Sequence, residues 1–135
     1  MHKEFLNPSD LPNWQQLFSQ VVIVKGTAAR TIYIAGQVSV DKDKNLIGAG
    51  DLRVQAGRTF KNLEIALAAA GATTADVVKL NIYVKNYQPA DAATISEVFR
   101  REFPQPNLPA STWLGVETLA EEGFLIEVDA IAVVE

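Results

Sequence analysis

Residues 125–133 read LIEVDAIAV, the stretch that indicates most about how this chain folds. Its period of two is typical of a β-strand, with one wholly apolar face made of Ile126, Val128, Ala130 and Ala132. The opposite face mixes apolar side chains with two carboxylates, Glu127 and Asp129. Because buried charge is costly unless it is paired or used, this second face is either solvated or part of a cleft.

Two amphipathic helices are predicted upstream of this strand. The first begins after an expected N-cap at Asp51 and stops at Gly71, with the apolar stripe Leu52, Ala56, Phe60, Leu63, Leu67 and Ala70. The second runs from about residue 89 or 90 to Phe103, because Pro104 forbids its continuation. Its apolar face comprises Ala92, Ile95, Phe99 and Phe103.

Four further strands are predicted. Residues 21–24 and 31–35 indicate a hairpin, and residues 110–116 form a strand after a proline-rich loop. Residues 76–85 alternate, with one face made of Val78, Leu80, Ile82 and Val84. The order strand, strand, helix, strand, helix, strand, strand predicts one α+β domain over residues 1–135. Its sheet is mixed, and right-handed crossovers place both helices on one face.

The other face of the predicted sheet has no helix to cover it. The last strand places Leu125, Ile131 and Val133 there, beside the two carboxylates. Water is a poor partner for such a surface, so we expect self-association through it in a closed, symmetric oligomer. The carboxylates would then lie at or near a subunit interface.

Composition limits the class of protein. The chain has 135 residues, of which 48% are hydrophobic and 21% charged, as in an ordinary globular domain. Its net charge of −4, with no basic run, argues against nucleic acid as a partner. No apolar run approaches the ~20 residues that span a bilayer, and the N-terminus does not resemble a secretory signal. We therefore expect a cytoplasmic protein with no membrane partner.

Few residues could carry catalysis. The chain has no cysteine, and its only histidine, His2, is expected to be solvated at the terminus, which argues against a thiol nucleophile or a Ser-His-Asp triad. No cluster has metal-ligand spacing, so no metal is expected. Glu127 and Asp129 remain, as same-face neighbours ~6–7 Å apart at the backbone.

This carboxylate pair has three interpretations. It could act as a general acid or base through water, or it could be a solvated or salt-bridged pair without a catalytic role. Its spacing also overlaps the ~6.5–9.5 Å of inverting glycosidases. We discount glycoside hydrolysis because two Trp and three Tyr suggest no aromatic sugar groove. The other two interpretations stay open.

Six segments, taken in order, resemble the Rid (reactive intermediate deaminase) family, also called YjgF-like: residues 34–38, 60–71, 76–79, 82–85, 108–112 and 127–132. The resemblance spans nearly the whole chain. It implies a chorismate-mutase-like α+β fold and a homotrimer with three clefts between subunits. It also implies hydrolysis of enamines and imines, such as 2-aminoacrylate, to a ketoacid and ammonia without a cofactor.

The resemblance assigns expected roles to individual residues. Phe18 corresponds to a cleft aromatic that is usually Tyr, and Gly36 to a glycine whose backbone lines the cleft. Asp129 corresponds to the acid that positions the attacking water, and Ser96 to a cleft-side Asn. Glu127, as the same-face neighbour of Asp129, is expected to contribute to substrate binding.

One departure from the family pattern is expected to change the substrate. The deaminating members have an arginine that binds the substrate carboxylate, and this chain has Ser111 there. A hydroxyl cannot replace the two charge-assisted hydrogen bonds of a guanidinium, at ~1.5–3 kcal/mol each. Trp113 would narrow or flatten the pocket. The cleft is thus more apolar, and a substrate other than 2-aminoacrylate is expected.

Three functions follow from these residues. The first is a trimeric enamine or imine deaminase that uses Asp129. The second is a protein that binds a small molecule or a partner on the same scaffold without catalysis, because a fold does not imply a function. The third, endoribonuclease activity, is disfavoured by the acidic net charge and the missing basic groove.

Overall fold

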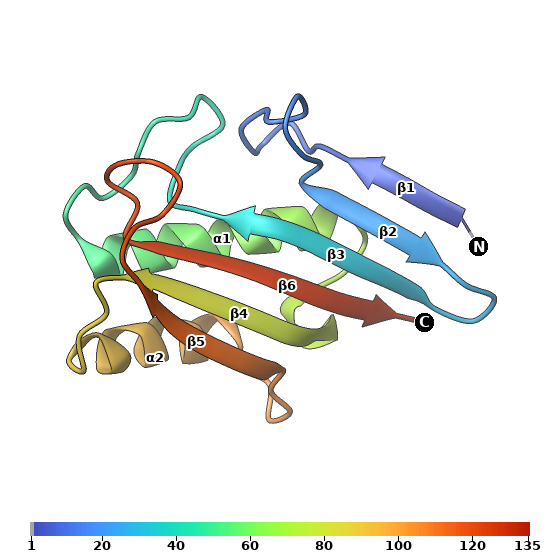
Figure 1. Cartoon of the computed structure of the whole chain (residues 1–135). Helices are drawn as coiled ribbons and strands as arrows, with labels where there is room; N and C mark the ends of the chain where they lie inside the picture. Colours follow the sequence, from blue (N-terminus) through green and yellow to red (C-terminus); the bar gives the residue numbers. More distant parts are fainter. Residues whose placement is uncertain (1) are drawn as a thin grey trace.

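A six-stranded mixed sheet with two helices on one face makes up the chain (Figure 1). The computed structural model describes residues 2–135. The strands lie in the order β1-β2-β3-β6-β4-β5, so the last strand occupies the middle of the sheet. The elements are β1 (His2–Leu6), β2 (Val21–Lys25), β3 (Arg30–Gln37), α1 (Leu52–Ala69), η1 (Thr74–Asp76), β4 (Val77–Lys85), α2 (Asp91–Glu102), β5 (Ala110–Val116) and β6 (Ile126–Val134).

The first helix begins and ends where the sequence predicts. Asp51 is the N-cap, and its Oδ1 accepts a hydrogen bond from the backbone N–H of Val54 at 3.1 Å. Gly71 follows the C-cap with φ +74°, a left-handed conformation that glycine adopts without strain. Leu52 is half-buried, and the rest of the predicted stripe is buried.

The helices pack on each other and on the sheet through aromatic side chains. Phe60 of α1 is 1% exposed, and its ring centroid lies 6.0 Å from that of Phe103, at the end of α2. Phe99 stacks on Phe103 at 4.8 Å. This aromatic cluster closes the core between the two helices, as the predicted stripe of α2 requires. None of the described helices is long and apolar enough to cross a bilayer.

The sheet contains one strand that the sequence did not predict. β1 pairs antiparallel with β2 at the sheet edge, and Glu4 forms an ion pair with Lys25 at 2.7 Å. Its residues include three charged or polar side chains and do not alternate cleanly, which explains why the pattern gave no signal. His2 therefore belongs to an edge strand, where it is exposed as expected.

One prediction for β4 was wrong. Val78 was expected on the same face as Leu80, Ile82 and Val84, yet it is 48% exposed, whereas Val77 is buried. The pairing register of β4 with β6 shifts between Val77 and Lys79, and such a bulge resets the alternation by one residue. The three later residues of the set are buried as predicted.

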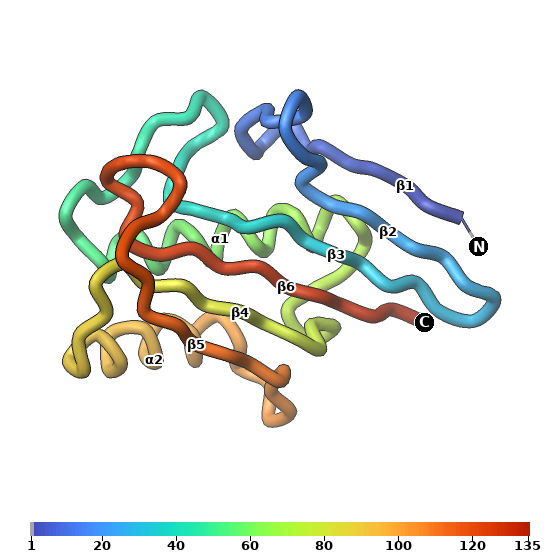
Figure 2. The backbone as a smooth tube through the Cα atoms, viewed as in Figure 1, coloured from blue at the N-terminus to red at the C-terminus, as the bar shows by residue number. Residues whose placement is uncertain are grey.

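The two faces of β6 differ as the alternation predicts. Ile126, Val128, Ala130 and Ala132 are 0–2% exposed under the helices. Glu127 and Asp129 alternate with these residues and so point to the opposite face. Both helices lie behind the sheet, and no helix covers that face (Figure 2). The fold therefore places the carboxylate pair at the centre of an uncovered sheet face.

Candidate functional site

Polar side chains from two neighbouring strands meet on the uncovered face. In the antiparallel register of β4 and β6, Asn81 lies opposite Asp129 and Tyr83 lies opposite Glu127. Paired residues of adjacent strands project on the same side, so the four side chains form one group. All four are partly buried within the single chain.

Asp129 is held by a neighbour. Asn81 Nδ2 donates a hydrogen bond to Asp129 Oδ1 at 2.8 Å, which orients the carboxylate along the sheet surface. Burial, together with the charge of Asp129, raises the pKa of the nearby Tyr83 hydroxyl. Tyr83 therefore stays protonated beside this carboxylate and can donate a hydrogen bond.

Glu127 occupies a different environment, against the backbone of β3. The pairing of β3 with β6 is irregular between Ile34 and Gln37, and Gly36 lies inside this irregular segment. A Cβ at Gly36 would overlap the Glu127 carboxyl group and lie 2.7 Å from its Cδ. Only glycine leaves room for this close approach. Burial, and then the charge of Asp129, raise the pKa of Glu127.

Apolar side chains surround these groups on the same face. Tyr33 of β3 is opposite Ile131 of β6, and it is 46% exposed. Val133 and Leu114 are also exposed to a large extent. Phe5 extends the apolar surface onto β1, opposite Val22 in the register. An exposed apolar area of this kind, with polar groups at its centre, is typical of an interaction or binding surface.

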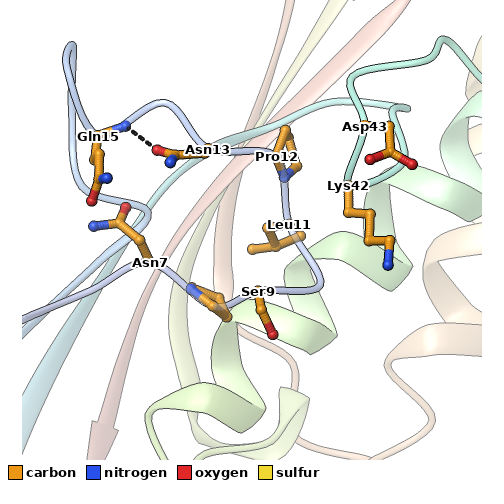
Figure 3. A pocket seen from close by; sticks show the side chains of 9 residues that line it. Asn7, Ser9, Leu11, Pro12, Asn13, Gln15, Lys42 and Asp43 are labelled. Atoms are coloured by element: carbon orange, nitrogen blue, oxygen red, sulfur yellow. Dashed lines mark hydrogen bonds between the residues drawn. The ribbon is translucent and has the colours of Figure 1, made fainter.

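Phe18 lies in the loop formed by residues 7–20, between β1 and β2. Its ring stacks on Trp14, with centroids 6.4 Å apart, and the Lys44 ammonium lies 4.3 Å from the centroid of the Trp14 ring. The first half of this loop and the turn at residues 41–45 enclose a polar cavity of about 420 Å³ (Figure 3). Leu11 of the loop is buried, so the loop is anchored to the core.

The remaining predicted site residues lie elsewhere in this chain. Ser111 and Trp113 pair with Leu80 and Ile82, so they project toward the helix side of the sheet. Ser111 is exposed, and Trp113 packs against the core. Ser96 is exposed on α2, in the helix layer. The structure thus brings Gly36, Glu127 and Asp129 together but not these three.

Two residues of the site were not identified from the sequence, Asn81 and Tyr83. The signal was present, because both alternate with the buried residues of β4 and so had to project from the uncovered face. The sequence pattern does not show that β4 pairs with β6, and only this pairing places Asn81 and Tyr83 beside the two carboxylates. Within residues 2–135, no group of three or more His, Cys, Asp or Glu side chains could hold a metal ion.

Comparisons with known proteins agree on one family. A family model described as endoribonuclease L-PSP matches residues 10–134. The 2-iminobutanoate/2-iminopropanoate deaminase of Dermatophagoides farinae is 32% identical over 118 residues, which are 87% of this chain and 86% of that protein. The protein of the same name from Rattus norvegicus is 33% identical over 131 residues, 97% of this chain and 90% of its own.

Solved structures show the same fold. The Rid-family protein YyfA of Yersinia pestis, described as a protein of unknown function, has a TM-score of 0.86 to this chain at 25% sequence identity. The match covers 98% of this chain and 100% of that one. The α+β fold predicted from the sequence, with two helices and a mixed sheet, is therefore confirmed.

Proposed function

This chain belongs to the endoribonuclease L-PSP family, also called YjgF/Rid/RutC, and on that premise we propose that it is a cofactor-independent imine or enamine deaminase. The observation that carries the proposal is the Glu127 carboxyl group, which is partly buried against Gly36 and has a raised pKa. Relatives at 32% and 33% identity are named imine deaminases, which supports the same class of reaction here.

Glu127, rather than Asp129, is the better candidate for the acid that handles protons. A carboxyl group with a raised pKa can give and take a proton nearer to neutral pH, which is what general acid–base catalysis requires. Asp129 accepts a hydrogen bond from Asn81, and its charge contributes to the raised pKa of Glu127. We assign Asp129 the role of setting the electrostatics of Glu127.

The proposed reaction needs only water. Glu127 in its ionised form takes a proton from water as the water oxygen attacks the imine carbon, the C–O bond forms and the C=N double bond becomes a single bond, and Glu127 passes this proton to the nitrogen. In the resulting carbinolamine, Glu127 takes the hydroxyl proton and delivers it to the amino nitrogen, the C=O double bond forms, the C–N bond breaks, and ammonia leaves. The products are a carbonyl compound and ammonia, and Glu127 returns to its starting state.

The proposed site is completed by assembly into a homotrimer. Tyr33, Leu114 and Val133 leave apolar surface around the carboxylates in the single chain, and a second copy would remove it from water. Ser111, Trp113 and Ser96 lie away from Glu127 within one chain. In a cleft between subunits, such residues of one copy can face the carboxylates of another.

The proposed substrate is an imine or enamine other than 2-aminoacrylate. Ser111 offers no positive charge to a small α-carboxylate, so the substrate lacks this group or is held by it differently. Phe18 and Trp113 favour bulky or apolar substituents. The acidic net charge of −4 continues to disfavour RNA as a substrate.

The test uses imines generated in situ by amino-acid oxidases and trapped with semicarbazide. An active deaminase removes the imine and lowers semicarbazone formation. We expect activity on aromatic or unsaturated imines, and a loss of about 10²–10⁴-fold in kcat/KM for Glu127→Gln. Asp129→Asn should cost less. Glu122→Gln, in an exposed turn, is the matched control and should leave turnover unchanged.

Two results would overturn the proposal. A larger loss in Asp129→Asn than in Glu127→Gln, with the oligomer intact, would return the proton-handling role to Asp129. Binding of imine analogues without turnover on any imine of the panel would instead support a non-catalytic ligand-binding protein on this scaffold.

A further inference from the structure

Two buried glutamines join the loop of Phe18 to the segment of β3 against which the Glu127 side chain packs. Gln20, at the end of the loop, is 2% exposed, and Gln37, which follows Gly36, is 3% exposed. Gln37 Nε2 donates to Gln20 Oε1 at 2.7 Å and to the carbonyl of Ala35 at 3.1 Å. Gln20 Nε2 donates to the carbonyl of Pro12 at 3.2 Å.

The backbone of Gln20 adds two further bonds to the same connection. The backbone N–H of Ala35 donates to the carbonyl of Gln20 at 2.9 Å. The N–H of Gln20 donates to Asn7 Oδ1, at the start of the loop, at 3.1 Å. Both ends of the loop, its middle at Pro12 and the irregular part of β3 are therefore linked through one residue pair.

This arrangement fixes geometry more than it adds stability. A buried amide gains little over an apolar side chain of the same size, because its hydrogen bonds mainly replace those lost to water. A buried polar network specifies one arrangement, since any other leaves an amide unsatisfied. Phe18 is two residues from Gln20, and Gly36 is adjacent to Gln37. The two glutamines therefore fix the position of the Phe18 loop relative to the Gly36 backbone, against which the Glu127 carboxyl group packs.

We propose that Gln20 and Gln37 are positioning residues that hold the Phe18 loop in register with Glu127 for the imine substrate. The inference rests on the proposed deaminase activity. Gln20 acts on the loop, so it governs how the substrate's apolar part is held. Gln37 also supports the Gly36 backbone, so it acts on both the loop and the catalytic carboxyl group.

The kinetic test compares Gln20→Met with Gln37→Met, which keep side-chain length. Gln20→Met removes both side-chain hydrogen bonds of Gln20. We expect it to raise KM for the best imine about three- to tenfold, with kcat nearly unchanged. Gln37→Met should raise KM and lower kcat together. Ile95→Val, a conservative core change in α2, is the stability control and should leave both KM and kcat unchanged.

A second measurement needs no activity. In a Trp113→Phe background Trp14 is the only tryptophan, and it reports on the loop because it stacks on Phe18. Gln20→Met should increase acrylamide quenching of Trp14, and Ile95→Val should not. Should Gln20→Met not fold, Asn7→Ala removes one bond of the loop at an exposed position and should act in the same direction.

The outcomes separate the two proposals. Unchanged quenching in both Gln20→Met and Asn7→Ala would overturn the positioning role, whatever the enzyme's activity. Equal changes in KM for Gln20→Met and Ile95→Val would show that Gln20 and Gln37 act as core residues without a positioning role. Increased quenching with no activity on any imine would leave the loop connection intact and count against the deaminase itself.

Discussion

The two faces of β6 alternate along one strand but behave in opposite ways. On the helix side, four small or branched apolar side chains are buried, and α1 packs against this face. On the other side, Glu127, Asp129 and Ile131 are half-buried, and Val133 is exposed. One face is covered within the chain, whereas the other is left uncovered, and there we propose that a second copy packs. Substitutions on the helix side of β6 should therefore mainly lower the free energy of unfolding. Substitutions on the uncovered side should mainly affect assembly and the proposed site.

The largest expected effect is on the helix side. Phe60→Ala should lower the free energy of unfolding by about 3–5 kcal/mol, because it opens a cavity between two other rings. Urea denaturation followed by circular dichroism measures the loss. Phe5→Ala, on the uncovered side and 61% exposed, is the matched control, at about 0.5 kcal/mol. Similar losses in the free energy of unfolding for the two variants would contradict the idea that the helix side of the sheet carries most of the stability.

A charge on the uncovered face should dissociate the proposed trimer without unfolding the chain. Val133→Glu would bury an unpaired carboxylate at the interface, at about 2–3 kcal/mol per subunit. Analytical ultracentrifugation should show monomers where the parent chain is trimeric. Val54→Glu, on the outer surface of α1 with similar exposure, should remain trimeric. A trimer that survives Val133→Glu would place the interface elsewhere.

Asn81→Ala tests the polar centre of the uncovered face. Loss of the hydrogen bond to Asp129 should cost about 1–2 kcal/mol, because the acceptor is a partly buried carboxylate. Asn45→Ala removes a bond of the same chemistry, Asn45 Nδ2 to Asp41 Oδ2 at 3.2 Å, in an exposed turn. Its loss should be smaller. Thermal unfolding of both variants at one pH decides the ranking, and equal losses would refute it.

The smallest effect concerns a second carboxyl pair, on the helix layer. Burial, a hydrogen bond with Glu102 and its charge raise the pKa of Glu64 from 4.5 to about 7. Between these values the unfolded chain has lost the proton and the folded chain keeps it. The free energy of unfolding therefore falls as pH rises toward 7, by about 0.5–1 kcal/mol after solvent screening. Glu64→Gln should remove this slope in urea melts from pH 4.5 to 8, whereas Glu121→Gln should not.

Much of the fold followed from local patterns in the sequence. Asp51 and Gly71 delimited α1 because capping is a local hydrogen-bond requirement. The alternation of β6 predicted both of its faces. β1 escaped prediction because an edge strand is stabilised by pairing and by one ion pair rather than by burial. Val78 was misplaced because a bulge depends on the partner strand.

The site was predicted only in part. Glu127 and Asp129 stood out as charges on an apolar strand, but their spacing alone could not distinguish their roles. Their surroundings differ because Gly36 approaches one and Asn81 the other, contacts between strands that are far apart in the sequence. The roles of Ser96, Ser111 and Trp113 remain predictions, since in the single chain these residues lie away from Glu127 and only the proposed trimer would bring them to it.

The sequence by itself determined the helices, most strands, the uncovered face and the family resemblance, because periodicity, caps and turn residues act over a few neighbouring positions. Only the tertiary structure decided which strand lies at the centre of the sheet and which carboxyl group rests on Gly36. It also decided that Gln20 and Gln37 join a loop to a strand 17 residues apart in the chain. These features arise from long-range pairing and desolvation, which no local pattern encodes.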